Sequence, residues 1–391
     1  MSYAVRRVDQ AHSEHRATDD HVHEKVQISH AASVNKQPPR RKHQTATQRP
    51  ISGPSRMRIR TCRDRSVGRV ARGVRCVSGL SRGYRPVLGY PGGDNSLVGP
   101  LSDLDGVPWA SLHGTHGPAD RIPAHLAALR SPDPTVAGEA LTRLRDAVVH
   151  QGTRWQVSAH VVRFLVLLIN DPGTPARPAL TRLLRDVGLG AYTDHDLPFG
   201  PKAAFDGPAV TRRQEDMVIA LVYYRDEGFT EEAMDIADSC AAKWAADAYR
   251  AVAAHVDAYR HWLGDDPLVA SQAAELLAWF PADEPTIAAL LSADGDDAVR
   301  ASANLALAHL PVSPCAIAAR MTDLLGHDSF VVRVTAAVAL ARRLGQELPD
   351  PALSLLIDAK DAAALPDFPL GWQHRAARGY VASALQRLGL G

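Results

Sequence analysis

A repeat of about 30 residues in the C-terminal half is the feature that most restricts how this 391-residue chain can fold. Val269 is followed 30 residues later by Val299, which is followed 33 residues later by Val332. Each valine is followed by small or apolar residues at i+4, i+7 and i+8, the spacing of one face of an α-helix. A unit this short cannot bury a core alone, so the pattern predicts helix pairs that stack on their neighbours.

Acidic residues stand before each repeat valine, and arginines follow two of them. Asp266, Asp297 and Asp328 precede the three valines, while Arg300 and Arg333 directly follow the second and third. An aspartate at a helix start can accept hydrogen bonds from the first free backbone N–H groups. We therefore expect these five residues and the three valines to be structural repeat positions.

Similar acidic residues at expected helix starts appear nearer the N-terminus, so the helical pattern extends over most of the chain. Asp133-Pro134 and Asp171-Pro172 each predict a helix start, and no segment alternates like a strand. The fold class we expect is all-α, an α-solenoid of stacked helix pairs. A Gly/Pro-rich connection at 188–208 suggests two groups of repeats, over residues 98–200 and 201–391.

Three stretches carry a resemblance to a known family. They are Leu104-Asp105-Gly106-Val107-Pro108-Trp109-Ala110-Ser111-Leu112, His150-Gln151-Gly152-Thr153 and His160-Val161-Val162-Arg163-Phe164-Leu165. With the repeat, they resemble an actinobacterial HEAT-repeat family whose members have no settled activity, and more broadly the bacterial HEAT-like, or lyase-type, repeats. The resemblance covers roughly residues 100–391, and it implies HEAT-like helix pairs without implying a particular function.

The N-terminal part differs sharply from this body. Residues 1–100 contain 19 Lys+Arg and 7 Asp+Glu, a net charge of +12. Residues 101–391 contain 25 Lys+Arg and 36 Asp+Glu, a net charge of −11. Residues 1–97 have no sustained apolar period, and we expect a disordered basic arm. Two interpretations stay open: a tail for nucleic acid or an acidic partner, or an upstream extension from a start codon placed too early.

Several classes of protein are excluded by composition. No apolar run approaches the roughly 18 residues of a membrane span, and the N-terminus lacks the apolar region of a secretory signal. Four cysteines in so long a chain do not form a disulfide framework. We expect a cytoplasmic protein without membrane contact.

Candidate chemistry is sparse. Asp194-His195-Asp196 and the pair His113 and His116 are weak metal-like clusters without a supporting ligand at helical spacing. No phosphate-binding loop, nucleophile elbow or Ser/His/Asp arrangement is present, so we expect no catalytic residue, no metal and no cofactor. The aromatic series from Tyr249 to Trp262 is either a ligand groove or the buried face of a long helix.

The surface we expect to bind a partner is the ridge of the second helices, outside the core positions. It comprises nine residues: Gln272, Glu275, Trp279, Ser302, Leu305, His309, Thr335, Val338 and Arg342. Trp279, His309 and Arg342 share one row of this three-by-three patch. Aromatic and arginine side chains are frequent in protein–protein contacts, and the acidic body favours a basic partner.

The sequence therefore predicts a non-catalytic helical scaffold that binds a protein through this ridge. Two alternatives stay open. The resemblance to lyase-type repeats also implies an enzyme, either a chromophore lyase or a glycosylase that acts on nucleic acid. The basic arm instead suggests a nucleic-acid adaptor. The patterns do not indicate an oligomeric state.

Overall fold

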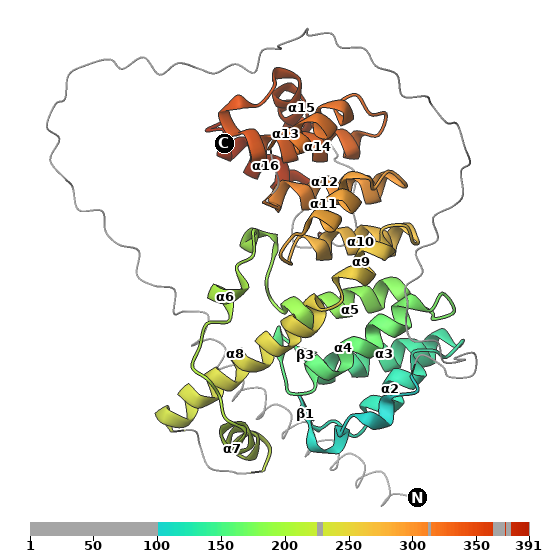
Figure 1. Ribbon diagram of the computed structural model, residues 1–391, viewed down its shortest axis with the longest axis vertical. Helices are drawn as coiled ribbons and strands as arrows, with labels where there is room; N and C mark the ends of the chain where they lie inside the picture. The colour runs from blue at the N-terminus through green and yellow to red at the C-terminus, as the bar shows by residue number, and fades with distance from the viewer. Residues whose placement is uncertain (1–100, 225–229, 312–313, 363–371, 373–376, 391) are drawn as a thin grey trace, which may run out of the picture. The chain divides into compact units, whose positions relative to one another are not determined.

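A computed structural model describes residues 101–224, 230–311, 314–362, 372 and 377–390. The predicted basic arm, residues 1–97, lies outside the described residues, and so do the roles suggested for it. The described residues belong to one compact unit, which is mostly helical (Figure 1). The all-α prediction is confirmed for this part of the chain.

The N-terminal half of the unit begins with short 3₁₀ helices and two small hairpins. Its elements are η1 (Leu104–Gly106), η2 (Trp109–Ser111), β1 (His113–Gly114), β2 (Gly117–Pro118), α2 (Ile122–Ala128), α3 (Pro134–Val148), β3 (Val149–His150), β4 (Thr153–Arg154), α4 (Ser158–Asn170), α5 (Arg177–Leu189), η3 (Asp194–Asp196), α6 (Pro201–Ala204), α7 (Arg212–Tyr223) and α8 (Glu231–Ala253).

The C-terminal half consists of helices joined by short connections. Its elements are α9 (Val256–Trp262), α10 (Pro267–Leu277), α11 (Glu284–Leu291), α12 (Asp297–His309), α13 (Pro314–Leu324), α14 (Phe330–Leu344), η4 (Gly345–Glu347), α15 (Asp350–Asp361) and α16 (Ala377–Arg387).

Side-chain caps explain why several helices begin where they do. Asp133 accepts a hydrogen bond from the backbone N–H of Thr135 at the start of α3, and Asp266 caps α10 in the same way. At α12 the capping residue is Asp296, while Asp297 lies in the first turn. Asp328 does not cap its helix, because α14 begins at Phe330 and the residue at its N-cap position is Ser329. The Asp-Pro signals thus mark the starts of α3 and α10, but the helix start predicted at Asp171-Pro172 is wrong, because α5 begins only at Arg177.

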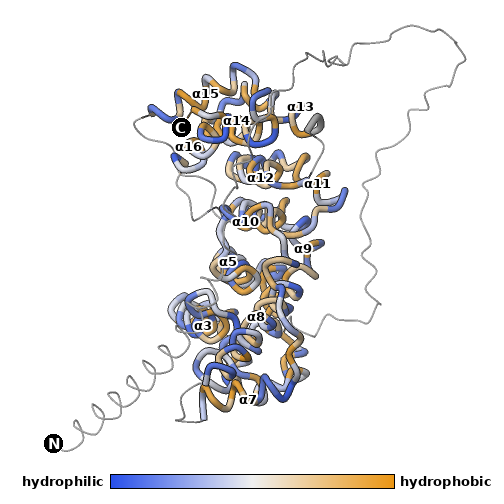
Figure 2. The backbone as a smooth tube through the Cα atoms, turned by 90° about the vertical axis from the view of Figure 1, so that its left-hand side faces the viewer, coloured by the Kyte–Doolittle hydropathy of each residue, from blue (hydrophilic) through white to orange (hydrophobic). Residues whose placement is uncertain are grey.

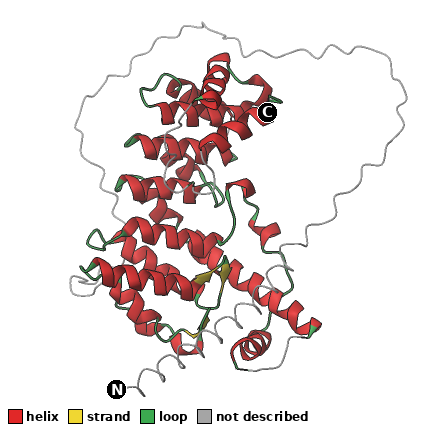
Figure 3. Ribbon diagram, turned by 180° about the vertical axis from the view of Figure 1, so that it is seen from behind, coloured by secondary structure: helices red, strands yellow, loops and turns green. Residues whose placement is uncertain are grey.

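Two antiparallel hairpins interrupt the helices, and neither was predicted (Figure 3). In the second, Gln151 (φ 49°) and Gly152 (φ 82°) form a two-residue turn with both φ angles positive, the geometry of a tight hairpin. Thr153 therefore pairs with His150 across the hairpin. Helix α4 begins five residues further on, at Ser158.

The helices of the repeat region lie in two rows. Helix α12 packs against both α10 and α14, while α9, α11 and α13 lie beside them in a second row (Figure 2). The repeat valines Val269, Val299 and Val332 are all buried, as expected of core positions. The second row covers one side of the first, so apolar side chains are removed from water between them.

One continuous core runs from Val107 to Leu385. It crosses the division expected between residues 200 and 201, since α5 packs against α8 and α10. The described residues of the groups 98–200 and 201–391 therefore share one hydrophobic core. Within the described ranges, none of the helices combines the length and hydropathy needed to cross a bilayer.

The aromatic series at the centre of the chain belongs to this core. Tyr259 and Trp262 are fully buried on α9, which is separated from α8 by a break at residues 254–255. The Trp262 indole N–H donates to Asn170 Oδ1 at the end of α4 (2.7 Å), and the Tyr259 hydroxyl donates to the backbone oxygen of Val252 (2.7 Å). Of the two interpretations, the structure supports the buried helix face.

Candidate interaction surface

The predicted ridge residues lie on α10, α12 and α14, except Trp279, which follows α10. Eight of the nine are buried: Gln272, Glu275, Trp279, Ser302, Leu305, His309, Thr335 and Val338 are each at most 6% exposed. The expectation that they lie outside the core is wrong for these eight residues. Arg342 alone among the nine is half-buried. The three helices pack side by side, so the flanks of each helix face a neighbour and not solvent.

Small polar side chains on these flanks connect neighbouring helices. The Ser302 hydroxyl on α12 donates to the backbone oxygen of Ser271 on α10 (2.6 Å). On the other flank of α12, the Asn304 amide donates to the Thr335 hydroxyl of α14 (3.2 Å). Buried polar groups need such partners, and these bonds fix the register of the three helices.

A buried ion pair joins α5 to α10. Arg185 Nε donates to Glu275 Oε1 (3.1 Å), and the Trp279 indole N–H donates to the same oxygen (2.5 Å). Burial raises the pKa of Glu275, and both of these contacts oppose that rise. Arg185 also donates to the backbone oxygen of Tyr192 (3.0 Å) and lies over the Trp279 ring. Glu275 and Trp279 therefore have internal partners, which accounts for their burial.

The segment between α5 and α7, residues 190–211, covers part of the predicted ridge. The Phe199 ring lies 5.6 Å from that of Trp279 and 5.4 Å from that of Tyr249, measured between centroids. Further along, Arg342 of α14 donates to the backbone oxygen of Leu197 (3.1 Å). This segment takes the place that we expected a partner to occupy beside Trp279.

Trp372 covers another part of the predicted ridge. Its indole N–H donates to the Ser302 hydroxyl (2.7 Å), and its ring stacks on the imidazole of His309 with centroids 6.0 Å apart. The Tyr380 ring of α16 meets the Trp372 ring edge-on at 6.2 Å. Trp372 thus covers Ser302 and His309, two of the predicted patch residues on α12.

A small pocket lies between α12, α14 and α16, at one part of the predicted surface. Its polar lining is His309, Arg342, Tyr380, Ser383 and Arg387, and its apolar lining is Leu305, Ala308, Val338 and Ala384. Four of the nine predicted residues line it, so the structure brings His309 and Arg342 together and leaves Trp279 elsewhere. The α16 residues were missed, although Tyr380, Ala384 and Arg387 follow one another at helical spacing.

The polar part of the pocket's described lining consists of hydrogen-bonding side chains from α12, α14 and α16. Its described lining offers guanidinium, imidazole and hydroxyl donors and contains no carboxylate. Across the described ranges, no group of three or more His, Cys, Asp and Glu side chains is arranged to hold a metal ion.

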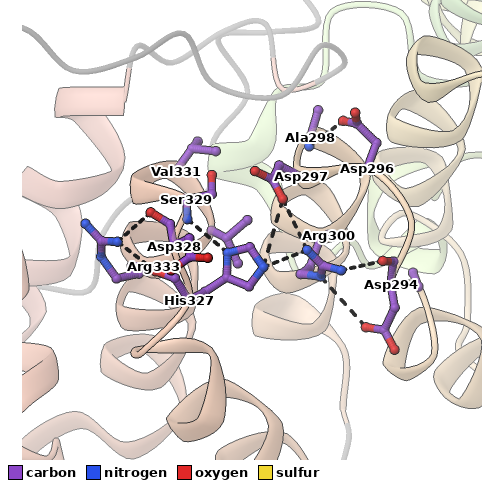
Figure 4. A network of polar contacts seen from close by, with 12 residues as sticks. Asp294, Asp296, Asp297, Ala298, Arg300, His327, Asp328, Ser329, Val331 and Arg333 are labelled. Atoms are coloured by element: carbon purple, nitrogen blue, oxygen red, sulfur yellow. Dashed lines mark hydrogen bonds and ion pairs between the residues drawn. The ribbon is translucent and has the colours of Figure 1, made fainter.

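Four of the structural repeat positions make polar contacts at the N-terminal ends of α12 and α14 (Figure 4). They are Asp297, Arg300, Asp328 and Arg333. Arg300 donates to Asp297 Oδ1 (3.1 Å) and to the backbone oxygen of Asp294, and its Nη1 lies 2.8 Å from His327 Nε2. Arg333 donates to the backbone oxygens of His327 (2.7 Å) and Asp328 (2.8 Å). Both arginines therefore tie a helix to the loop before it.

A smaller aromatic cluster lies at the first hairpin. His113 Nε2 and the Tyr224 hydroxyl are 2.8 Å apart, and Tyr224 is 62% exposed. Burial lowers the pKa of His113, while a hydrogen bond with Gln156 opposes that shift. His116 is instead close to His150, with ring centroids 6.2 Å apart. The two histidines of the predicted pair therefore have different neighbours.

No protein-family model matches the sequence, and a search of curated proteins finds no significant match. A function for the chain therefore has to come from its own residues and their geometry.

Proposed function

We propose that residues 98–391 form an α-solenoid of HEAT-like helix pairs, a non-catalytic cytoplasmic scaffold that binds a protein partner. The observation that carries the proposal is the small pocket at α12, α14 and α16, where His309 and Arg342 from the predicted surface meet Arg387. Three helices contribute to it, so a partner bound there would contact several units of the stack at once.

The repeated contacts support the solenoid part of the proposal. Helices α10, α12 and α14 pack in sequence order, and each has a helix of the second row against it. Stacked repeats of this kind present extended surfaces to partners, and they need no catalytic group to do so. The acidic charge of residues 101–391 favours a partner of basic overall charge.

Site-specific photo-cross-linking in the native host tests the scaffold function. A photoreactive residue replaces Gln386, an exposed neighbour of the pocket on α16, in the full-length protein. The matched control places the same residue at Val136 on α3, which is 44% exposed. We expect one dominant cross-linked protein from position 386 that is absent from position 136. The same products from both positions, or none from position 386, would contradict the proposal.

A further inference from the structure

A long connection lies against the stacked helices. Residues 190–211, all within the described part of the chain, join α5 to α7 and include just the short helices η3 and α6 (Figure 1). By comparison, residues 263–266 suffice to join α9 to α10. Loops longer than about 12–15 residues are uncommon in compact domains, and many of them are lids or binding loops. We call residues 190–211 the strap.

Aromatic rings anchor the middle of the strap to its neighbours. The Phe199 ring lies 5.4 Å from the ring of Tyr249 on α8 and 5.6 Å from the ring of Trp279 after α10, measured between centroids. The Phe205 ring lies 5.3 Å from that of Tyr249. These separations are those of attractive aromatic pairs. Phe199 therefore occupies a place between two rings of the stack, as the side chain of a bound peptide would.

Two arginines of the stack hold the strap through its backbone. Arg185 of α5 donates to the backbone oxygen of Tyr192 (3.0 Å), and Arg342 of α14 donates to that of Leu197 (3.1 Å). Every residue of a peptide has a backbone oxygen, so any extended segment can accept these bonds. The selective part of the contact is then the aromatic side chain, which is the residue type that dominates many protein interfaces.

The outer side of the strap has the properties of a segment that opens readily. Lys202, Ala203 and residues 206–209 are exposed. Its backbone hydrogen bonds include short-range ones, such as that from the Phe205 N–H to the oxygen of Pro201 (3.0 Å). Exposed segments with local hydrogen bonds open at a lower free-energy cost than core helices do.

We propose that the strap is a built-in competitor on a docking surface formed by Tyr249, Trp279 and Arg342, and that the partner displaces it with an extended segment carrying an aromatic residue. The inference rests on the proposed scaffold function, and it states how binding is regulated and what the partner presents. Arg342 also lines the small pocket, so the two surfaces adjoin. A tethered segment acts at an effective concentration in the millimolar range, so a free segment binds well only when the strap is weakened.

A peptide with the sequence of residues 190–206 tests this surface without the host partner. It carries a fluorophore and is titrated with the full-length protein and with its Phe199→Ala variant, and binding is followed by fluorescence anisotropy. We expect saturable binding to the variant and binding at least about tenfold weaker to the unmodified protein, because the intact strap competes. A second peptide that itself carries Phe199→Ala should bind neither protein.

Two further variants make the test specific. Phe330→Ala is the matched control, since it changes another half-buried phenylalanine, on α14, and should leave peptide binding as weak as in the unmodified protein. Replacing residues 197–205 by Gly and Ser at equal length keeps the connection and removes its anchors, so this variant should bind the peptide at least as tightly as Phe199→Ala. Circular dichroism and urea unfolding check that each variant is folded. Equal binding to Phe199→Ala and Phe330→Ala, or no binding to either strap variant, would overturn the inference. Loss of the folded state in both strap variants would make the strap a part of the core and would also overturn it.

A photoreactive phenylalanine analogue at position 199 of the peptide locates the contact. We expect cross-links to residues around Tyr249 and Trp279, and cross-links confined to other parts of the protein would reject this surface. A dominant partner cross-link from position 386 without peptide binding would retain the scaffold function and reject the strap as a competitor. Peptide binding beside Tyr249 and Trp279 without a cross-link from position 386 would retain the docking surface and reject the small pocket as the scaffold's contact.

Discussion

At the scale of single residues, Trp279 shows how a position that looks exposed in the repeat frame becomes part of the core. Its side chain is 1% exposed, and its indole N–H is bonded to the buried Glu275. The frame could not reveal this, because Arg185 and Phe199, which surround the ring, come from a distant part of the sequence.

Trp279→Ala is expected to lower the free energy of unfolding by about 3–5 kcal/mol, because it leaves a cavity and removes a donor from Glu275. Urea unfolding measures the change. The control is Tyr224→Ala, which removes a 62% exposed ring and should cost less than about 1 kcal/mol. An unchanged midpoint for Trp279→Ala would mean that the ring is free for a partner after all.

The Arg177–Asp265 pair links α5 to the start of α10. Arg177 Nε donates to the backbone oxygen of Ile169 (2.6 Å), and Nη1 donates to Asp265 Oδ1 (2.9 Å). The hydrogen bond from Arg177 lowers the pKa of Asp265 below its ordinary value. The ionised pair therefore stabilises the fold above the unfolded-state pKa, and this contribution is lost as the pH falls through the folded-state pKa.

Arg177→Gln should cost about 1.5–3 kcal/mol at neutral pH, since both partners are largely buried. The deficit should shrink in acid, as the pH falls through the lowered folded-state pKa of Asp265 and its carboxylate is protonated. Urea unfolding at neutral and acid pH checks both parts. Arg212→Gln breaks an exposed pair with Asp216 and should cost less than about 0.5 kcal/mol. A deficit that persists undiminished in acid would remove the ion pair as its cause.

At the scale of elements, the sequence predicted those helix starts that depend on nearby residues. It did not predict the features that depend on residues distant in the sequence. Aspartate caps at α3 and α10 act within one turn, so their sequence signals were sufficient. The hairpins were missed because strands of two residues cannot alternate.

The candidate site was only partly predictable for a related reason. His309 and Arg342 were placed on one row by the repeat period, and the structure keeps them in one pocket. The residues that cover the rest, such as Phe199 and Trp372, lie in connections with no period of their own. Burial by an irregular segment depends on the whole fold, so a helical frame cannot reveal it.

Replacing two glycines by alanine is expected to change the stability of the protein in opposite directions. Gly345 ends α14 with φ +56°, and a Cβ there would meet no atom within 4 Å, so Gly345→Ala should cost about 1 kcal/mol or more through backbone strain alone. Gly138 is an exposed helical residue of α3 with equally open space. Gly138→Ala should therefore stabilise by up to about 1 kcal/mol. Thermal unfolding compares them, and shifts of the same sign would contradict this reasoning.

At the scale of the whole molecule, charge separates the chain into two parts with different physical properties. Among the described residues, one continuous core extends from Val107 to Leu385. The net charge of +12 in residues 1–100 stands against −11 in residues 101–391. We therefore expect attraction to polyanions in the first part, while the described core and the pocket lie in the second.

We expect removal of residues 1–97 to leave the unfolding midpoint unchanged, because the described residues from Val107 to Leu385 already form one continuous core. Binding to random-sequence DNA should behave differently. We expect the full-length protein to bind DNA weakly at low salt, with an affinity that falls steeply as salt rises, and the shortened protein to bind none. Fluorescence anisotropy over a salt series measures both proteins side by side. Equal DNA binding by the two would place a nucleic-acid surface on the helical unit, against the sign of its charge, and would move the function away from the pocket.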